Sequence, residues 1–284
     1  MEIVPMLILI ILATLIGILS SSMGVGGGFI IVPLLVLVYD LKAHIAIGTS
    51  ITTVLFSALS ATIGYFKQKR IDWKLGIITA ISTIPTAHLG AYTTKFFESK
   101  VLSSIFGIAL ALVGLRMISG TVFFFKQKGR VYDNSLLSKS NNLQKGWHRK
   151  LIDASGITFD YYIKNPILGF LLLSLCGFAS AFLGVGGGVM IVPLYVIVMG
   201  MPIHLATATS VFSIIFTSLS GAWAHILLGN ISLEYAIPLI IGVVTGAQIG
   251  TRVAKRLKSK IMQFTFGLMI LFIGTFMAIT KLLT

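Results

Sequence analysis

The chain has few cysteines and few acidic residues, and both shortages limit its chemistry. Its one cysteine, Cys176, lies in an apolar run, which excludes a disulfide framework and a cysteine-rich metal site. Only 8 of the 284 residues are Asp or Glu, and none is expected deep inside an apolar segment. A buried carboxylate relay, a membrane metalloenzyme and an aspartyl protease are therefore disfavoured. We expect neither enzyme activity nor a metal or other cofactor.

Charge of either sign is scarce, at 11% of residues, whereas 56% are hydrophobic and the mean hydropathy is +0.98. This composition is typical of a membrane protein, in which about 20 apolar residues form one crossing helix. The net charge of +14 comes from short basic clusters beside the apolar runs, so it indicates topology and predicts no nucleic-acid partner. The sequence predicts a multi-pass protein of the cell membrane, surrounded by lipid. The long apolar runs are 45–66, 75–94, 101–125, 204–228, 235–251 and 261–283.

The sequence GVGGG occurs twice, at 24–28 and 184–188, and IVPL follows each copy after two residues. When the two copies are superimposed without a gap, 24–34 matches 184–194 at nine of eleven positions, and 44–60 matches 204–220 at seven of seventeen. Duplication explains this most simply. It predicts two transmembrane units, residues 1–125 and 166–284, joined by a basic linker of residues 126–165 with only local structure.

Each glycine run separates two apolar arms, 3–21 from 29–39 and 166–182 from 189–199. One continuous helix over both arms would be roughly 55 Å long, nearly twice the roughly 30 Å of the hydrocarbon core. The sequence therefore predicts an all-α integral membrane protein. Each unit should begin with a broken, re-entrant helical hairpin that turns at its glycines, followed by three transmembrane helices.

With the hairpin counted as two passes, each unit crosses an odd number of times, so the second unit should be inverted relative to the first. If the linker is cytoplasmic, the segments 67–74, 126–164 and 252–260 hold four, eight and five of the 22 Lys and Arg residues. A parallel repeat would place the last five outside, against the positive-inside bias. Charge therefore favours inverted-topology repeats and a cytoplasmic linker.

Backbone that turns within the bilayer is tolerated only where it is buried in protein or lines a cavity. Glycine permits positive φ, and the helix that follows presents free N–H groups and the positive end of its dipole. We therefore expect the two turns to face each other and bind one small anion. The predicted substrate-binding glycines are Gly24, Gly26, Gly27, Gly28, Gly184, Gly186, Gly187 and Gly188.

The alternative is that these glycines only let helices pack closely. Consecutive glycines destabilise a helix by about 1 kcal/mol each, and packing needs spaced small residues instead. Such spacing occurs elsewhere, and we interpret it as packing ridges, which permit a homodimer without requiring one. The ridges are Gly242, Gly246 and Gly250 in the second unit and Ser82, Thr86 and Gly90 in the first.

Polar residues recur at matching depths of the two units. Thr49 and Ser50, like Thr209 and Ser210, are expected to donate hydroxyl hydrogen bonds to the anion, or else to bond carbonyls of their own helix. His88 and Gln248 occupy equivalent positions, where they either line the site or form interhelical hydrogen bonds.

Arg116 is the one basic residue well inside a predicted span. It either supplies a fixed positive charge for the anion or extends toward the basic inner surface.

The paired segments GVGGGFIIVPLL and GVGGGVMIVPLY, each followed by HxAxxTS, resemble the signature of the sulfite exporter TauE/SafE family of membrane permeases. The resemblance covers essentially the whole chain. It implies transport of small anions such as sulfite and sulfoacetate, and it supports the glycine runs and the Thr–Ser pairs as site residues. We expect a secondary transporter that works by alternating access, with export as the default direction. An anion channel and a membrane scaffold or sensor are the alternatives.

Overall fold

The structure is a computed structural model that describes residues 3–126, 147–254, 268, 271, 272 and 274–276. Among these residues, five helices are long and apolar enough to cross a membrane, and shorter apolar helices accompany them. The chain is therefore a multi-pass membrane protein, as its composition predicts. The helices are α1 (Ile3–Met23), α2 (Gly28–Leu37), α3 (Ala43–Lys67), α4 (Trp73–Thr93), α5 (Ser99–Lys126), α7 (Pro166–Leu183), α8 (Gly188–Pro193), α9 (Ile203–Leu227) and α10 (Leu233–Val253).

The predicted apolar runs coincide with helices to within two residues. The run 45–66 is α3, the run 75–94 is α4 and the run 204–228 is α9. Their ends carry charged or polar loops, such as Lys69–Asp72, which cannot enter the hydrocarbon core. The last predicted run, 261–283, lies largely outside the described residues.

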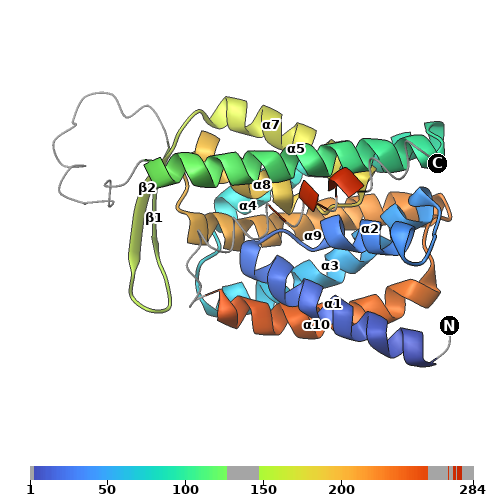
Figure 1. The fold of residues 1–284 in the computed structure, drawn as a ribbon. Helices are drawn as coiled ribbons and strands as arrows, with labels where there is room; N and C mark the ends of the chain where they lie inside the picture. The colour runs from blue at the N-terminus through green and yellow to red at the C-terminus, as the bar shows by residue number, and fades with distance from the viewer. Residues whose placement is uncertain (1–2, 127–146, 255–267, 269–270, 273, 277–284) are drawn as a thin grey trace.

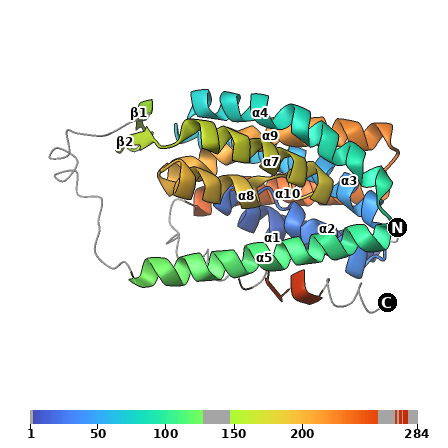
Figure 2. The ribbon, with the colours of Figure 1, turned by 90° about the horizontal axis from the view of Figure 1, so that it is seen from above.

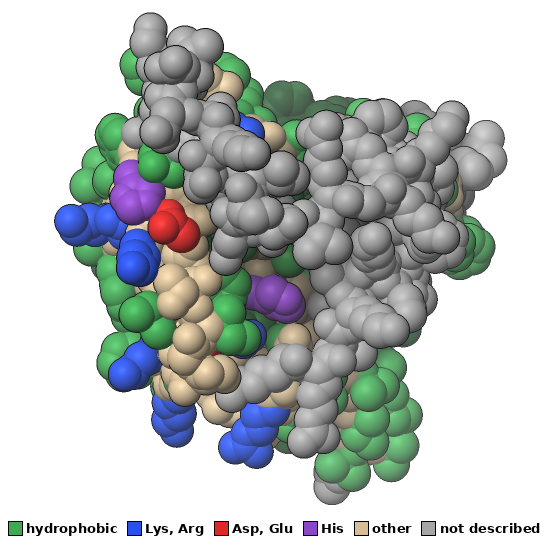
Figure 3. All heavy atoms as spheres, turned by 90° about the vertical axis from the view of Figure 1, so that its left-hand side faces the viewer, with side chains coloured by type: hydrophobic (Ala, Val, Ile, Leu, Met, Phe, Trp, Pro, Cys, Tyr) green, Lys and Arg blue, Asp and Glu red, His purple; other side chains and the backbone are tan. Residues whose placement is uncertain are grey.

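The helices lie side by side along one common direction, and an antiparallel strand pair crosses one end of the bundle (Figures 1 and 2). Helix α1 starts at the end where the N-terminus lies, and α2 returns toward that end. Helix α7 starts at the opposite end, beside the strands, which we call the hairpin end. Lys and Arg side chains gather along an edge of this end (Figure 3).

Helices of the two halves of the chain interleave. Helix α10 packs against α1 and α3, and α4 packs against α7 and α9. A Cβ atom added at Gly246 would lie well inside 3.0 Å of the Thr14 carbonyl oxygen, and one at Gly90 equally close to the Phe178 carbonyl oxygen. The interpretation of these small residues as packing ridges is confirmed, and both ridges are used within one chain.

The linker contains a β-hairpin, so the prediction of an all-α chain is wrong at this point. Strand β1 (Trp147–Ile152) pairs antiparallel with β2 (Thr158–Ile163). The sequence TFDYYI of β2 is rich in aromatic and β-branched residues that favour strands. The Asp153 carboxylate accepts hydrogen bonds from the Ser155 and Ile157 amides and closes the turn, in which Gly156 has a φ of 81°. Linker residues 127–146 are outside the described residues.

Candidate functional site

Both glycine runs break the helices at the predicted positions. Gly24, Gly26 and Gly27 have φ angles of 76°, 91° and 95°, which few other residues adopt, and Gly28 is the first residue of α2. The second run repeats the pattern: three left-handed glycines precede α8, and all five residues of each run are buried. The residues between α1 and α2 and between α7 and α8 are thus tight, buried turns.

The two turns lie against each other in the interior. A Cβ atom added at Gly28 would lie well inside 3.0 Å of the Gly184 carbonyl oxygen, and one at Gly188 equally close to the Gly24 carbonyl oxygen. Backbone therefore meets backbone at the start of both helices. The structure brings together all eight glycines that the sequence singled out.

One serine on α3 and its equivalent on α9 take part in this contact between the glycine turns. Ser50 Oγ donates to the Gly184 carbonyl at 2.8 Å, and Ser210 Oγ donates to the Gly24 carbonyl at the same distance. Each serine therefore bonds the glycine turn of the other half of the chain. Ser210 also bonds the Thr207 carbonyl of its own helix, at 2.9 Å.

The neighbouring threonines form hydrogen bonds with loops and not with the glycine turns. Thr49 Oγ1 accepts a hydrogen bond from the Ser232 amide, and Thr209 Oγ1 accepts one from the Asp72 amide, both at 3.0 Å. Thr49 and Thr209 are equivalent positions of the two sequence copies, and so are Asp72 and Ser232. Each threonine therefore secures the loop that leads into α10 or α4.

Six backbone donors at the facing turns are unusual. Within the described residues, the N–H groups of Gly26, Gly27 and Gly28, and those of 186–188, have no hydrogen-bond acceptor. Buried N–H groups are rarely left unpaired in proteins. They stand at the starts of α2 and α8, where helix dipoles add positive potential. The arrangement provides a cluster of donors that suits an anion.

Gln248 and His88 form no hydrogen bond with the glycine turns among the described residues. Gln248 Nε2 donates to the Ser60 carbonyl oxygen at 2.6 Å and to Ser60 Oγ at 3.0 Å, which joins α10 to α3. Ser60 is ten residues beyond Ser50, roughly 15 Å along the helix. His88 is half-buried, without a hydrogen-bond partner among the described residues. The geometry of Gln248 fits the interhelical alternative, and a ligand role for either residue stays a prediction.

Arg116 belongs to α5, but its side chain is outside the described part.

Comparisons with known proteins show which family the chain belongs to. A family model described as "Sulfite exporter TauE/SafE" matches residues 9–277. The chain belongs to the TauE/SafE family. Members of this family are membrane transporters, not enzymes.

Two curated relatives of this TauE/SafE chain match over nearly their full length. The chain is 31% identical to the probable membrane transporter protein YunE of Bacillus subtilis, over 94% of this chain and 95% of that protein. It is 25% identical to the probable membrane transporter protein MJ0441 of Methanocaldococcus jannaschii, over 95% and 94%. No solved structure gives a significant match.

The TauE/SafE chain also contains a buried hydroxyl cluster that the sequence analysis overlooked. Thr79 Oγ1 lies 2.6 Å from the Tyr195 hydroxyl, which lies 3.2 Å from Ser213 Oγ. One turn further, Thr83 Oγ1 lies 2.8 Å from Thr217 Oγ1. Ser213 and Thr217 are four residues apart on α9, and this spacing is the signal that could have revealed them.

At the hairpin end, the TauE/SafE chain has a buried carboxylate whose burial no sequence pattern predicts. The Asp72 side chain is 1% exposed. It accepts hydrogen bonds from Arg149 Nε at 2.8 Å and the Tyr161 hydroxyl at 2.6 Å, and it caps α4 through the Leu75 amide. The linker hairpin is thereby fixed to the loop between α3 and α4.

A second ion pair holds the hairpin turn. Arg70 Nη2 lies 2.9 Å from Asp153 Oδ2, and the Ala154 amide donates to the Gln68 carbonyl at 3.0 Å. Burial raises the pKa of Asp153, but the bonds from Arg70 and two backbone amides outweigh it and hold the pKa below its usual value. Burial likewise raises the pKa of Asp72, and the bonds from Arg149, Tyr161 and Leu75 lower it overall. Both carboxylates are therefore ionised at neutral pH.

Proposed function

We propose that this protein is a secondary transporter of a small sulfur-containing anion, such as sulfite or an organosulfonate, and that it exports its substrate. The substrate is held near the midplane by the paired glycine turns. Alternating access arises as one unit rocks against the other.

Two observations support inverted units. Helix α1 starts and α2 ends toward one end of the bundle, whereas α7 starts at the other end (Figure 1). Four pairs of hydrogen bonds also recur between equivalent positions of the two sequence copies. They are Ser50 to Gly184 and Ser210 to Gly24, Ser232 to Thr49 and Asp72 to Thr209, Tyr65 to Ser21 and His225 to Ala181, and Ser60 to Val244 and Ser220 to Ile84.

The single observation that carries the anion site is the set of unpaired N–H groups at the facing turns. In a dry interior an oxyanion with several acceptor oxygens satisfies several such donors at once. The hydroxyls of Ser50 and Ser210 reach the same anion when they exchange their carbonyl partners for its oxygens. A sulfonate or sulfite has three oxygens that can each accept more than one hydrogen bond, so one such anion can satisfy several of these donors.

The first test is thermal unfolding of the detergent-purified protein with sulfite, sulfoacetate, sulfate, taurine or acetate. Binding to the native state raises its apparent stability, so the substrate should raise the midpoint and acetate should not. Ser210→Ala should abolish the shift. Thr245→Ala is the matched control, because that exposed hydroxyl bonds only carbonyls of its own helix.

Flux into liposomes then separates the alternatives. A transporter gives saturable, substrate-selective flux, whereas an anion channel gives flux that does not saturate at carrier-like rates. A folded protein that neither binds nor moves any of these anions would refute the proposal and favour a scaffold or sensor.

A further inference from the structure

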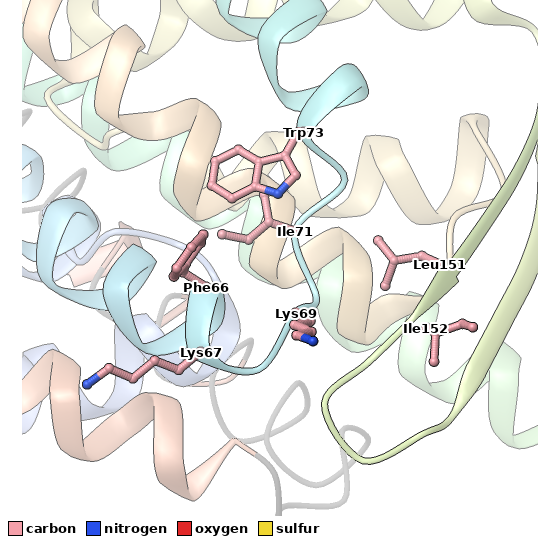
Figure 4. Close-up of a pocket in the computed structure, with 7 residues that line it drawn as sticks. All are labelled: Phe66, Lys67, Lys69, Ile71, Trp73, Leu151 and Ile152. Atoms are coloured by element: carbon pink, nitrogen blue, oxygen red, sulfur yellow. The ribbon is translucent and has the colours of Figure 1, made fainter.

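A pocket of about 440 Å³ lies at the hairpin end, between the last turn of α3, the start of α4 and the tip-side half of β1 (Figure 4). Its lining includes no residue of the glycine turns and neither of the serines that bond them, so it plays no part in the anion site proposed above. Because α3 is a candidate membrane span that ends at Lys67, the pocket stands where hydrocarbon gives way to water. Its lining residues are Phe66, Lys67, Lys69, Ile71, Trp73, Leu151 and Ile152.

The wall of the pocket continues into the surface that faces the lipid. Phe66 and Trp73 are 60% and 42% exposed, and their rings meet edge to face with centroids 5.8 Å apart. One turn deeper, Ile63 on α3 and Ile77 on α4 are more than half exposed as well. These side chains form an apolar track along two helices, from the bilayer into the pocket. A single acyl chain fits such a track.

The charge of the pocket is positive. Lys67 and Lys69 are exposed, and neither forms an ion pair with any described acidic residue. In Figure 4, Lys69 lies in the gap between the α3–α4 loop and the hairpin, while Lys67 extends outward. The nearby carboxylates of Asp72 and Asp153 are already neutralised by Arg149 and Arg70. The two ammonium groups therefore remain available to an external anion.

We propose that this pocket binds an anionic phospholipid. The phosphate lies at Lys69, Lys67 adds positive potential from the rim of the pocket, and one acyl chain runs along Phe66 and Trp73. Aromatic side chains at the membrane boundary and basic pockets between membrane helices are the chemistry that selects such lipids. A zwitterionic lipid offers the same chains without the net negative charge, so it binds less tightly.

The experiment uses the full-length protein in detergent, titrated with phosphatidylglycerol or phosphatidylcholine and followed by native mass spectrometry and thermal unfolding. Phosphatidylglycerol should bind more tightly than phosphatidylcholine. Lys69→Gln should weaken phosphatidylglycerol binding about fivefold, the effect of one basic residue near a membrane surface, and Lys69→Arg should retain it. Lys100→Gln is the matched control, because Lys100 is equally exposed at the opposite end of α5 from the linker.

Three results would overturn the proposal. The two lipids bind equally, or Lys69→Gln and Lys100→Gln weaken phosphatidylglycerol alike, or glycerol 3-phosphate without chains binds as tightly as the lipid. The last result would identify a soluble-anion site. Unfolding of each variant without added lipid separates loss of binding from loss of fold.

Discussion

At Gly28 and Gly188, a hydrogen atom is the largest side chain that the facing backbone allows. Neither residue has a positive φ, since both are the first residues of helices, so their requirement for glycine is steric. At Gly26 and Gly186 the positive φ is a further requirement, and a Cβ atom there would also meet the Val54 side chain. The GVGGG sequence thus meets two different physical demands within five residues.

Gly28→Ala should destabilise the protein by about 3 kcal/mol, because the new methyl group meets the immobile Gly184 carbonyl. Thermal unfolding in detergent measures the loss. Gly229→Ala is the comparison: its φ of 68° strains an alanine, but a Cβ atom there meets nothing within 4 Å, so it should cost about 1 kcal/mol. Equal losses for the two variants would contradict close contact between the turns.

At the scale of elements, the hairpin is bound to the bundle mainly through side chains of its two strands and its turn. Asp72 receives bonds from β1 and from β2, and Asp153 in the turn receives them from Arg70. Because Asp72 also caps α4, one carboxylate joins three elements. Residues 147–163 of the linker are therefore a structural part of the hairpin end.

Arg149→Met should cost about 3 kcal/mol, since it leaves the buried Asp72 carboxylate without its charged partner. Lys150→Met is the control on the same strand, because Lys150 is exposed and should change stability by less than about 0.5 kcal/mol. Chemical or thermal unfolding of both variants measures these losses of stability relative to the unmodified protein. A similar stability for both would mean that the hairpin does not depend on this pair.

The same carboxylates predict how stability depends on pH. Asp72 and Asp153 have folded-state pKa values below the ordinary value of about 3.9. The unfolded state therefore binds protons first, and the stabilisation present at neutral pH is lost as pH falls below about 5. Asp72→Asn should reduce the slope of stability against pH in this range. An unchanged slope would show that the pKa of Asp72 is not lowered in the folded state.

Sequence patterns predicted elements whose cause is local. The composition of α3 and α9 and the glycine turns at 24–28 and 184–188 can be read from neighbouring residues, so these predictions hold. The strands of the hairpin had a local signal in TFDYYI that went unused, whereas the docking of the hairpin could not be predicted because it depends on Asp72 and Arg149, which are 77 positions apart. The contact of Ser50 with Gly184 was not predicted in detail either, since hydroxyl spacing does not name a partner 134 residues away.

At the scale of the whole molecule, neither half can bury its own ridges. Helix α1 packs on α10, and α7 packs on α4, so each first arm covers a helix of the other half. The unit boundaries predicted from the repeat therefore describe sequence copies whose packing surfaces are shared. We therefore expect the folding of each half to depend on the other.

Fragments 1–136 and 137–284, expressed separately, should be degraded or aggregate, because each exposes a ridge of small residues to lipid without its partner. Co-expressed fragments should assemble, since the cut leaves every described helix and strand intact. Size-exclusion chromatography and the anion-induced thermal shift check assembly. A stable, monodisperse single fragment would contradict the interleaved packing.

The described hairpin lies at one end of the bundle, and this makes the two end states of the proposed transport cycle unequal in free energy. Two identical inverted units would populate inward- and outward-open states equally. Docking of β1 and β2 favours whichever state keeps the α3–α4 loop against Thr209. A preference of about 1.4 kcal/mol shifts the two populations tenfold. In the proposed cycle, docking of the hairpin would thus set the resting state, while the substrate gradient sets the direction of net transport.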